Sequence, residues 1–235
     1  MQDVRSERIA AAVRSQPMFR GLPPDDLQHI IELARVRDYD RGDALWNEGD
    51  PADHLTIILK GRVKIVKHGD NADVIFEIFE AGEPVGALAV YNGIPYPASA
   101  ICLEPTSLLL LPRREYFEVL ERRPEVARSI IRELTRLVVG LLRRLQETRG
   151  ERIETRIARL FLKLADRMGR ESPEGIEIDI WLSRQDIAEL VGTTVETSIR
   201  TMSRWGREGV IVTGERRFVV PSIERLREIA DGGDA

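Results

Sequence analysis

The chain has 235 residues, of which 43% are hydrophobic and 31% are charged, and its formal net charge at pH 7 is −4. This composition is typical of a soluble globular protein with one large or two modest domains, and no apolar run is long enough to cross a bilayer. The single cysteine, Cys102, excludes an internal disulfide, a cysteine-clustered zinc site and an iron–sulfur cluster. The N-terminal segment is charged and lacks the apolar core of a signal peptide, so we expect a cytoplasmic protein that does not contact a membrane.

Residues 1–35 are predicted to be helical, with a break at Gln16-Pro17. From Val36 to Leu111 the apolar pattern changes to that of strands, and short apolar runs alternate with turn sequences rich in glycine, aspartate and proline. The predicted strands are Ala44–Asn47, Leu55–Leu59, Val63–Val66, Val74–Phe79, Ala98–Leu103 and Ser107–Leu111. Many short strands with regular turn signals predict a sandwich, barrel or jelly roll.

A short helix over Arg113–Glu121 is followed by one long predicted helix over residues 122–149. In that helix Ile130, Leu134, Leu137 and Leu141 are spaced four, three and four apart, which is the pattern of a coiled-coil seam. A second apolar stripe consists of Ile131, Val138, Leu142 and Leu145. A helix that is apolar on two sides needs two partners, and we expect its own β domain and the identical helix of a second chain. The alternative is a helix buried in the core of a monomer.

The C-terminal part is predicted to contain a helix over Ile153–Met168, a loop over Gly169–Gly175, a strand over Ile176–Trp181 and then two short helices. Ser183 is a good N-cap for the first of these, and Gly192 ends it. Thr193 or Thr194 caps the second, and Thr193 with Glu196 fits a capping box. Two helices joined by a tight turn with a glycine are a helix-turn-helix, whose second helix reads bases in the DNA major groove.

Glu196 and Arg200 lie four residues apart, so they project from one face of the second helix. A carboxylate accepts a hydrogen bond from cytosine N4, and an arginine binds guanine O6 and N7. Val210–Thr213 and Arg217–Val220, around Gly214-Glu215, predict a hairpin or wing, and Ser222 caps a last helix over Ile223–Ile229. The alternative is an ordinary helical hairpin with a Glu–Arg surface pair. The net negative charge counts mildly against DNA binding, but arginines gather around this helix.

The fold class is therefore α+β, with three predicted segments: a β-rich domain with N-terminal helices at 1–121, which the family resemblance given below implies to be a β-roll sensor domain, a dimerisation helix at 122–149 and a winged helix-turn-helix domain at 150–235. The recognition helix is placed at residues 194–207. The residues expected to contact DNA are Ser183, Arg184, Gln185, Thr193, Thr194, Val195, Glu196, Thr197, Ser198, Ile199, Arg200, Arg204 and Arg217.

This order of elements resembles the Crp–Fnr family of bacterial transcription regulators. Gly42-Asp43-Ala44-Leu45-Trp46-Asn47-Glu48-Gly49-Asp50, with the segment from Leu55 to Ile65, is similar to the family's cyclic-nucleotide-binding β-roll, a jelly roll. Val195-Glu196-Thr197 followed by Arg200 is similar to its recognition helix. The resemblance implies a homodimer on a two-fold symmetric operator, with RNA polymerase as a partner.

The same resemblance indicates which operator to expect. Cyclic-AMP-responsive members carry an arginine where Val195 stands, whereas Fnr-like members carry valine. Fnr itself has a serine where this chain has Ile199. We therefore expect a half-site with a TGA core, nearer TTGAT than TGTGA.

Cyclic-nucleotide binders of this family hold the ribose with a glutamate and the phosphate with an arginine. Here Ala87 stands at the glutamate position and Pro97 or Ala98 at the arginine position. A phosphodiester buried without a cation is disfavoured, so cAMP is not expected. The residues assigned to an effector pocket are Gly86, Ala87, Leu88, Tyr96, Pro97, Ala98 and Ser99.

Few residues of the sequence could bind a cofactor other than a nucleotide. Haem is an alternative through His29, His54 or His68, although such histidines are more often structural or solvated. Cys102 alternates within a strand and is predicted to be a small core residue and not a redox switch. No metal site is expected, and the effector, if there is one, stays unidentified.

The leading hypothesis is a homodimeric, sequence-specific DNA-binding regulator. Two alternatives are a ligand-binding module that acts on a protein partner and a haem-based gas sensor of the same family. The sequence has no HExxH, P-loop or nucleophile–base motif, so an enzyme is not expected.

Overall fold

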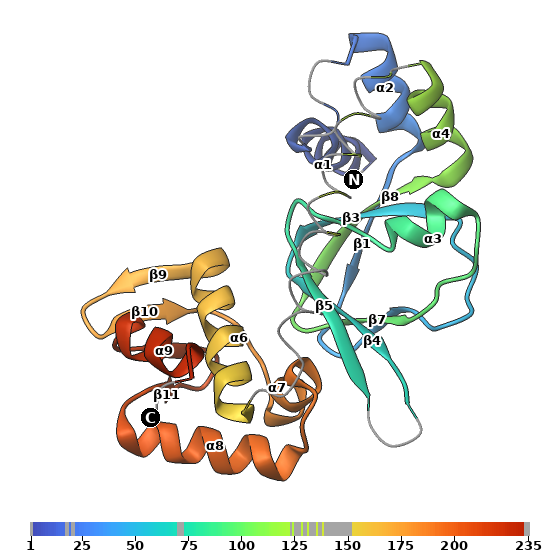
Figure 1. The fold of residues 1–235 in the computed structure, drawn as a ribbon. Helices are drawn as coiled ribbons and strands as arrows, with labels where there is room; N and C mark the ends of the chain where they lie inside the picture. Colours follow the sequence, from blue (N-terminus) through green and yellow to red (C-terminus); the bar gives the residue numbers. More distant parts are fainter. Residues whose placement is uncertain are drawn as a thin grey trace. The chain divides into compact units, whose positions relative to one another are not determined.

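The computed structural model describes residues 2–16, 19, 22–69, 73–122, 124, 128, 131, 135, 138 and 152–232. The chain forms two compact units, one built mainly from residues 1–141 and the other mainly from residues 142–235 (Figure 1). The four residues of the predicted dimer seam, Ile130, Leu134, Leu137 and Leu141, lie outside the described residues. Within the described ranges, no helix is both long and apolar enough to span a bilayer.

The first unit is a β-roll of two four-stranded antiparallel sheets, which confirms the predicted jelly-roll class. In order across the sheet, one consists of β1 (Arg35–Tyr39), β8 (Thr106–Pro112), β3 (His54–Lys60) and β6 (Pro84–Val85), and the other of β2 (Ala44–Trp46), β7 (Ser99–Cys102), β4 (Arg62–Lys67) and β5 (Val74–Glu80). Ile58 and Leu108 of the first sheet pack against Val63 and Ala100 of the second in one apolar core. Cys102 is buried in that core, as predicted.

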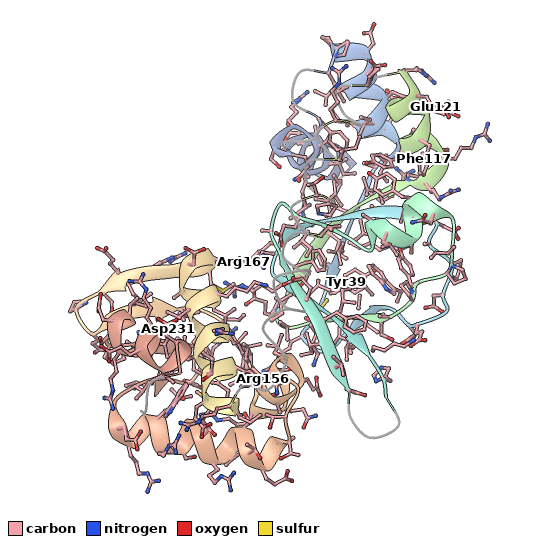
Figure 2. All side chains as sticks on the ribbon, viewed as in Figure 1. Tyr39, Phe117, Glu121, Arg156, Arg167 and Asp231 are labelled. Atoms are coloured by element: carbon pink, nitrogen blue, oxygen red, sulfur yellow. The ribbon has the colours of Figure 1, made fainter. Side chains whose placement is uncertain are left out.

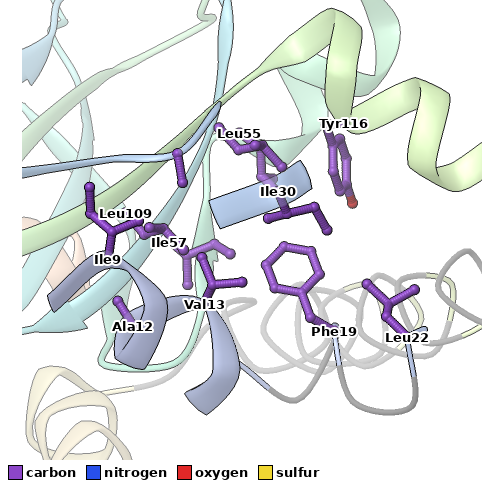
Figure 3. Close-up of a cluster of buried hydrophobic side chains, with 12 residues drawn as sticks. Ile9, Ala12, Val13, Phe19, Leu22, Ile30, Leu55, Ile57, Leu109 and Tyr116 are labelled. Atoms are coloured by element: carbon purple, nitrogen blue, oxygen red, sulfur yellow. The ribbon is translucent and has the colours of Figure 1, made fainter. Parts of the chain in front are cut away.

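Helices cover the outer face of the first sheet (Figures 1 and 3). They are α1 (Gln2–Ser15), α2 (Pro24–Leu33) and α4 (Arg113–Arg122), and the short α3 (Ala87–Asn92) follows β6. Successive side chains of a strand face opposite sides of its sheet. Leu55 and Ile57 of β3 therefore join Ile30 and Tyr116 of the covering helices, whereas Ile58 faces the interior of the roll. β1 and β6 are not among the predicted strands, because neither shows an apolar run.

The second unit, as far as the structure describes it, packs four helices around a small sheet. Its elements are α6 (Ile153–Met168), β9 (Gly169–Ser172), β10 (Gly175–Ile178), α7 (Arg184–Val191), α8 (Val195–Glu208), β11 (Val212–Thr213), β12 (Phe218–Val220) and α9 (Ile223–Ala230), with the strands in the order β11-β12-β10-β9. The bounds of α6 are those predicted. Phe161 of α6 meets Phe218 of β12 edge to face, with ring centroids 5.0 Å apart.

The prediction of a loop over Gly169–Gly175 is wrong, because residues 169–172 form β9 and pair with β10. The sequence Gly-Arg-Glu-Ser has no apolar alternation, so the strand period is absent there. The turn depends on Gly175, whose φ is +124°. A Cβ at this position would stand 2.3 Å from the carbonyl oxygen of Val220, so only glycine fits.

Candidate nucleic-acid interface

The first helix of the helix-turn-helix, α7, begins with a complete capping box. The Ser183 hydroxyl accepts a hydrogen bond from the Asp186 amide at 3.1 Å, and the Ser183 amide donates to the Asp186 carboxylate at 2.9 Å. The helix ends at Gly192, which adopts the left-handed conformation with φ +65°. Arg156 of α6, labelled in Figure 2, donates to the Gly192 carbonyl at 3.1 Å. The turn between the two helices is therefore held from both sides.

The second helix, α8, is capped by Thr194, whose hydroxyl accepts from the Thr197 amide at 3.3 Å. The predicted capping box of Thr193 with Glu196 is wrong. The Thr193 amide donates to the Ala188 carbonyl at 2.9 Å, so Thr193 closes the end of α7 and does not open α8.

One face of α8 is buried in the second unit. It consists of Ser198, Thr201, Met202 and Trp205, which are spaced as neighbours on one side of a helix. Ser198 is 0% exposed, so the prediction that it contacts DNA is wrong. Its position three and four residues before Thr201 and Met202 turns it inward, although serine is a polar residue.

The opposite face of α8 is exposed along its length. It consists of Glu196, Ile199, Arg200, Ser203 and Arg207, which we call the outer stripe. Ile199 is 47% exposed, so the outer stripe carries one large apolar side chain among its polar ones. Within the described part of the chain, neither Glu196 nor Arg200 forms a hydrogen bond or an ion pair. Ser203 and Arg207 were not predicted as contacts. Ser203 follows Glu196 by seven residues and Arg207 follows Arg200 by seven, and this spacing, which is two helical turns, could have placed them on the same face.

Three of the predicted DNA-contacting arginines have partners inside the unit. Arg184 donates to the Thr213 hydroxyl at 3.0 Å, and burial lowers its pKa from the usual value. Arg204 pairs with Glu154 of α6 at 3.1 Å, and Arg217 pairs with Glu177 of β10 at 2.8 Å. These ion pairs tie α8 and the wing hairpin to the rest of the unit. The same arginines are therefore less available to phosphates than the sequence predicts.

The remaining predicted contacts lie around the helix N-termini and stay predictions. Gln185 is exposed and donates to Glu189 at 2.6 Å, and the exposed Thr194 hydroxyl donates to that of Thr197 at 3.1 Å. Val195 is half-buried at the start of α8.

The predicted effector segment of the first unit is filled by aromatic rings. Tyr96 stacks on Trp46 with ring centroids 3.9 Å apart and an interplanar angle of 11°. Both rings lie against Gly86, where an added Cβ would meet Tyr96 at 2.7 Å and Trp46 at 2.9 Å. The Trp46 indole donates to the Ala98 carbonyl at 3.1 Å, which fixes the stack in place.

The other residues assigned to the effector pocket do not line an accessible pocket for a phosphate. Ala87, Ala98 and Ser99 are buried, and the Ser99 hydroxyl accepts from the Glu48 amide at 3.0 Å. Leu88 and Pro97 point outward and are exposed. The start of α3, where helix amides could meet a phosphate, is therefore packed against the two rings.

In the part of the chain that the structure describes, no residues are arranged as a binding site for haem or for a metal ion. His29, His54 and His68 are all exposed, whereas an axial haem ligand sits in a protected pocket. Among the described residues, no three histidine, cysteine or acidic side chains gather as metal ligands would.

Two domain families match this chain, one over each unit. Residues 36–123 match the cyclic nucleotide-binding domain, and residues 155–229 match the Crp-like helix-turn-helix domain. The chain belongs to the Crp–Fnr family of transcription regulators. The helix-turn-helix described above is thus the DNA-binding domain of a Crp–Fnr regulator.

Similar Crp–Fnr proteins align with nearly the whole chain. The CRP-like cAMP-activated global transcriptional regulator of Mycobacterium tuberculosis is 26% identical, over 89% of this chain and 94% of its own. The cyclic AMP receptor protein of Thermus thermophilus is also 26% identical, over 94% of this chain and 99% of its own. The transcriptional activator protein anr of Pseudomonas aeruginosa is 25% identical, over 87% and 84%.

Solved structures show the same fold. A CooA mutant from Carboxydothermus hydrogenoformans has a TM-score of 0.71 at 19% identity, covering 85% of this chain and 88% of its own. FixK2 from Bradyrhizobium japonicum has a TM-score of 0.69 at 21% identity, covering 86% and 98%.

Proposed function

We propose that this Crp–Fnr regulator is a homodimer that reads a palindromic operator with a TGA core, nearer TTGAT than TGTGA. The observation that carries the proposal is the outer stripe of α8, on which Glu196 and Arg200 are exposed, one helical turn apart and unpaired among the described residues. Arg200 reads a guanine through O6 and N7, and Glu196 accepts from a cytosine N4. Val195 and the exposed Ile199 contact thymine methyl groups. RNA polymerase is the expected protein partner.

The dimer is proposed to form through the helix over residues 122–149. Arg128, Ile131, Thr135 and Val138 are helical and exposed, and their three, four, three spacing is that of a coiled-coil face. Ile131 is 60% exposed and Val138 53%. Two large apolar side chains exposed on one helix face are stabilised when a second copy covers them. Ile131 and Val138 belong to the second of the two predicted stripes, whereas the predicted seam, Ile130, Leu134, Leu137 and Leu141, lies outside the described residues.

The proposal is tested by titrating the full chain into two fluorescently labelled duplexes, one with a TTGAT palindrome and one with the same bases scrambled. We expect the anisotropy to report a preference for the palindrome of about 1,000-fold or more. Affinity for both duplexes should fall at least about tenfold between roughly 50 and 200 mM salt, because bound arginines displace counterions. Equal affinity for the two duplexes at every salt concentration would contradict base reading.

We infer that cAMP is not the effector. The segment 84–100 contains no lysine or arginine, and the Trp46–Tyr96 stack lies against Gly86 at the start of α3. A cyclic nucleotide would have to displace two buried rings and leave its phosphate without a cation from this segment.

Isothermal titration calorimetry with cAMP should therefore give no binding at concentrations up to about 1 mM. The cyclic AMP receptor protein of Thermus thermophilus, titrated in the same buffer, is the matched control. A micromolar dissociation constant for this chain would overturn the inference.

A further inference from the structure

The β-roll contains a cavity that borders the segment assigned to an effector, with Tyr96 as the shared residue. The cavity has a volume of about 290 Å³ and lies between β1, β3 and β8 of one sheet and β2 of the other. Of the seven residues predicted to form the effector pocket, only Tyr96 lines it. Small-molecule sites occupy concave pockets of about 300–1,000 Å³, so the cavity suits a ligand of about one aromatic ring.

The side chains of β1 that line this cavity include two arginines. Arg35, Arg37 and Tyr39 line it, whereas Val36, between them, packs against the core under the helices. Across the ladder Arg35 is paired with Leu110 and Arg37 with Leu108, both of which also line the cavity. Arg35 and Arg37 are both exposed and stand at the rim of the cavity, on the edge strand of the sheet. Two guanidiniums at the rim of one concave site point to a negatively charged occupant.

The two arginines differ in how they are held. Arg35 donates through Nη1 to three carbonyls at the end of α2, those of Glu32 at 3.0 Å, Leu33 at 3.2 Å and Ala34 at 2.8 Å. Its guanidinium is therefore fixed. Arg37 forms no hydrogen bond or ion pair with any residue that the structure describes, so it is the available cation of the pair.

The wall of the cavity is aromatic and rigid. Trp46 is held by its hydrogen bond to Ala98, and Tyr96 stacks on it at 3.9 Å and is hydrogen-bonded to Thr56. Burial raises the pKa of Tyr96 to about 12, so its hydroxyl stays neutral near pH 7. Trp46 and Tyr96 are 7% and 5% exposed, so they form a fixed floor, and a planar ligand body can lie on the part of the rings that is exposed.

Two carboxylates limit the charge of that ligand. Asp50 and Asp53 line the cavity together with the arginines and His54. The Asp50 carboxylate accepts from the Asn47 amide at 2.8 Å and holds the turn after β2, whereas Asp53 is exposed. The two acidic charges oppose a dianion and favour a monoanion that also carries a hydrogen-bond donor.

We propose that this cavity binds a small planar monocarboxylate. Its carboxylate is held by Arg37 with the help of Arg35, its ring lies against Tyr39, Trp46 and Tyr96, and a donor at its far end meets Asp53. The proposal does not depend on the operator or on the dimer, because it concerns ligand binding to the first unit alone.

The test uses the full chain without DNA and 4-hydroxybenzoate as the probe, with binding followed by calorimetry. We expect saturable binding to the wild type, weaker binding of benzoate, which lacks the far donor, and much weaker binding of inorganic phosphate. Arg37→Gln removes a charged hydrogen-bond donor from an exposed position and should weaken binding by about tenfold or more. The control, Arg114→Gln, removes an arginine whose side chain is 86% exposed on α4 and should bind as the wild type does.

Three results would overturn the proposal: no binding of 4-hydroxybenzoate up to about 10 mM, equal affinity in the Arg37→Gln and Arg114→Gln variants, or phosphate binding as tightly as the monocarboxylate. Thermal melts of both variants, expected to match the wild type, show that a loss of binding is not a loss of fold.

Discussion

Arg200→Ala should remove the preference for the palindromic duplex while leaving weak binding to any duplex. The Arg200 guanidinium is exposed on the outer stripe of α8 and has no partner among the described residues. A bidentate arginine–guanine contact contributes about 1–3 kcal/mol of discrimination. A dimer makes it twice, so specific affinity should fall by roughly 30-fold to 20,000-fold.

The control for this prediction lies on the same helix. Arg207 is exposed, carries the same charge and follows Arg200 by seven residues. Arg207→Ala should weaken binding to palindromic and scrambled duplexes by the same factor, because a phosphate contact carries no sequence information. Anisotropy titrations of both variants on both duplexes, at one salt concentration, separate the two roles. If Arg200→Ala loses no more preference than Arg207→Ala, α8 does not read bases through Arg200.

Trp205→Ala should lower the free energy of unfolding of the second unit by about 3–5 kcal/mol. Trp205 is 0% exposed and lies on the buried face of α8, so its loss leaves a large cavity under the recognition helix. That loss is a large share of the roughly 5–15 kcal/mol by which a domain is stable. Urea unfolding followed by circular dichroism measures it.

Two further variants sharpen this measurement. Trp205→Phe should cost less than Trp205→Ala, because the ring is partly kept and the indole N–H has no hydrogen-bond partner among the described residues. Ser203→Ala, on the exposed face of the same helix, should change stability by less than about 0.5 kcal/mol. A loss below about 1 kcal/mol for Trp205→Ala would mean that the core of the second unit does not depend on this side chain.

The elements of this protein with strong local signals could be predicted from its sequence. The bounds of α6 follow from apolar residues at helical spacing, and the start of α7 follows from Ser183 with Asp186. β9 shows no such signal, because its stability comes from pairing with β10 and not from an apolar run. Ser198 illustrates the same limit: its chemistry suggests an exposed residue, whereas it lies on the face of α8 that is buried in the unit.

The sensor unit depends still more on contacts between distant parts of the chain. The substitutions at Ala87, Pro97 and Ala98 predict the loss of a cyclic-nucleotide cradle from local residues alone. The stack of Trp46 on Tyr96 joins residues fifty positions apart, and nothing local to either residue indicates it. The cavity beside β1 is lined by strands from both sheets. That Arg35 and Arg37 line a cavity therefore cannot be predicted from the sequence near them.

The most direct test of the proposed function is the mass of the complex between the full chain and a duplex that contains one TTGAT palindrome. Light scattering after size-exclusion chromatography should give two chains per duplex, and a duplex with one half-site scrambled should bind far more weakly. A complex with one chain per duplex, or equal binding to both duplexes, would contradict a symmetric dimer that reads its operator with Glu196 and Arg200.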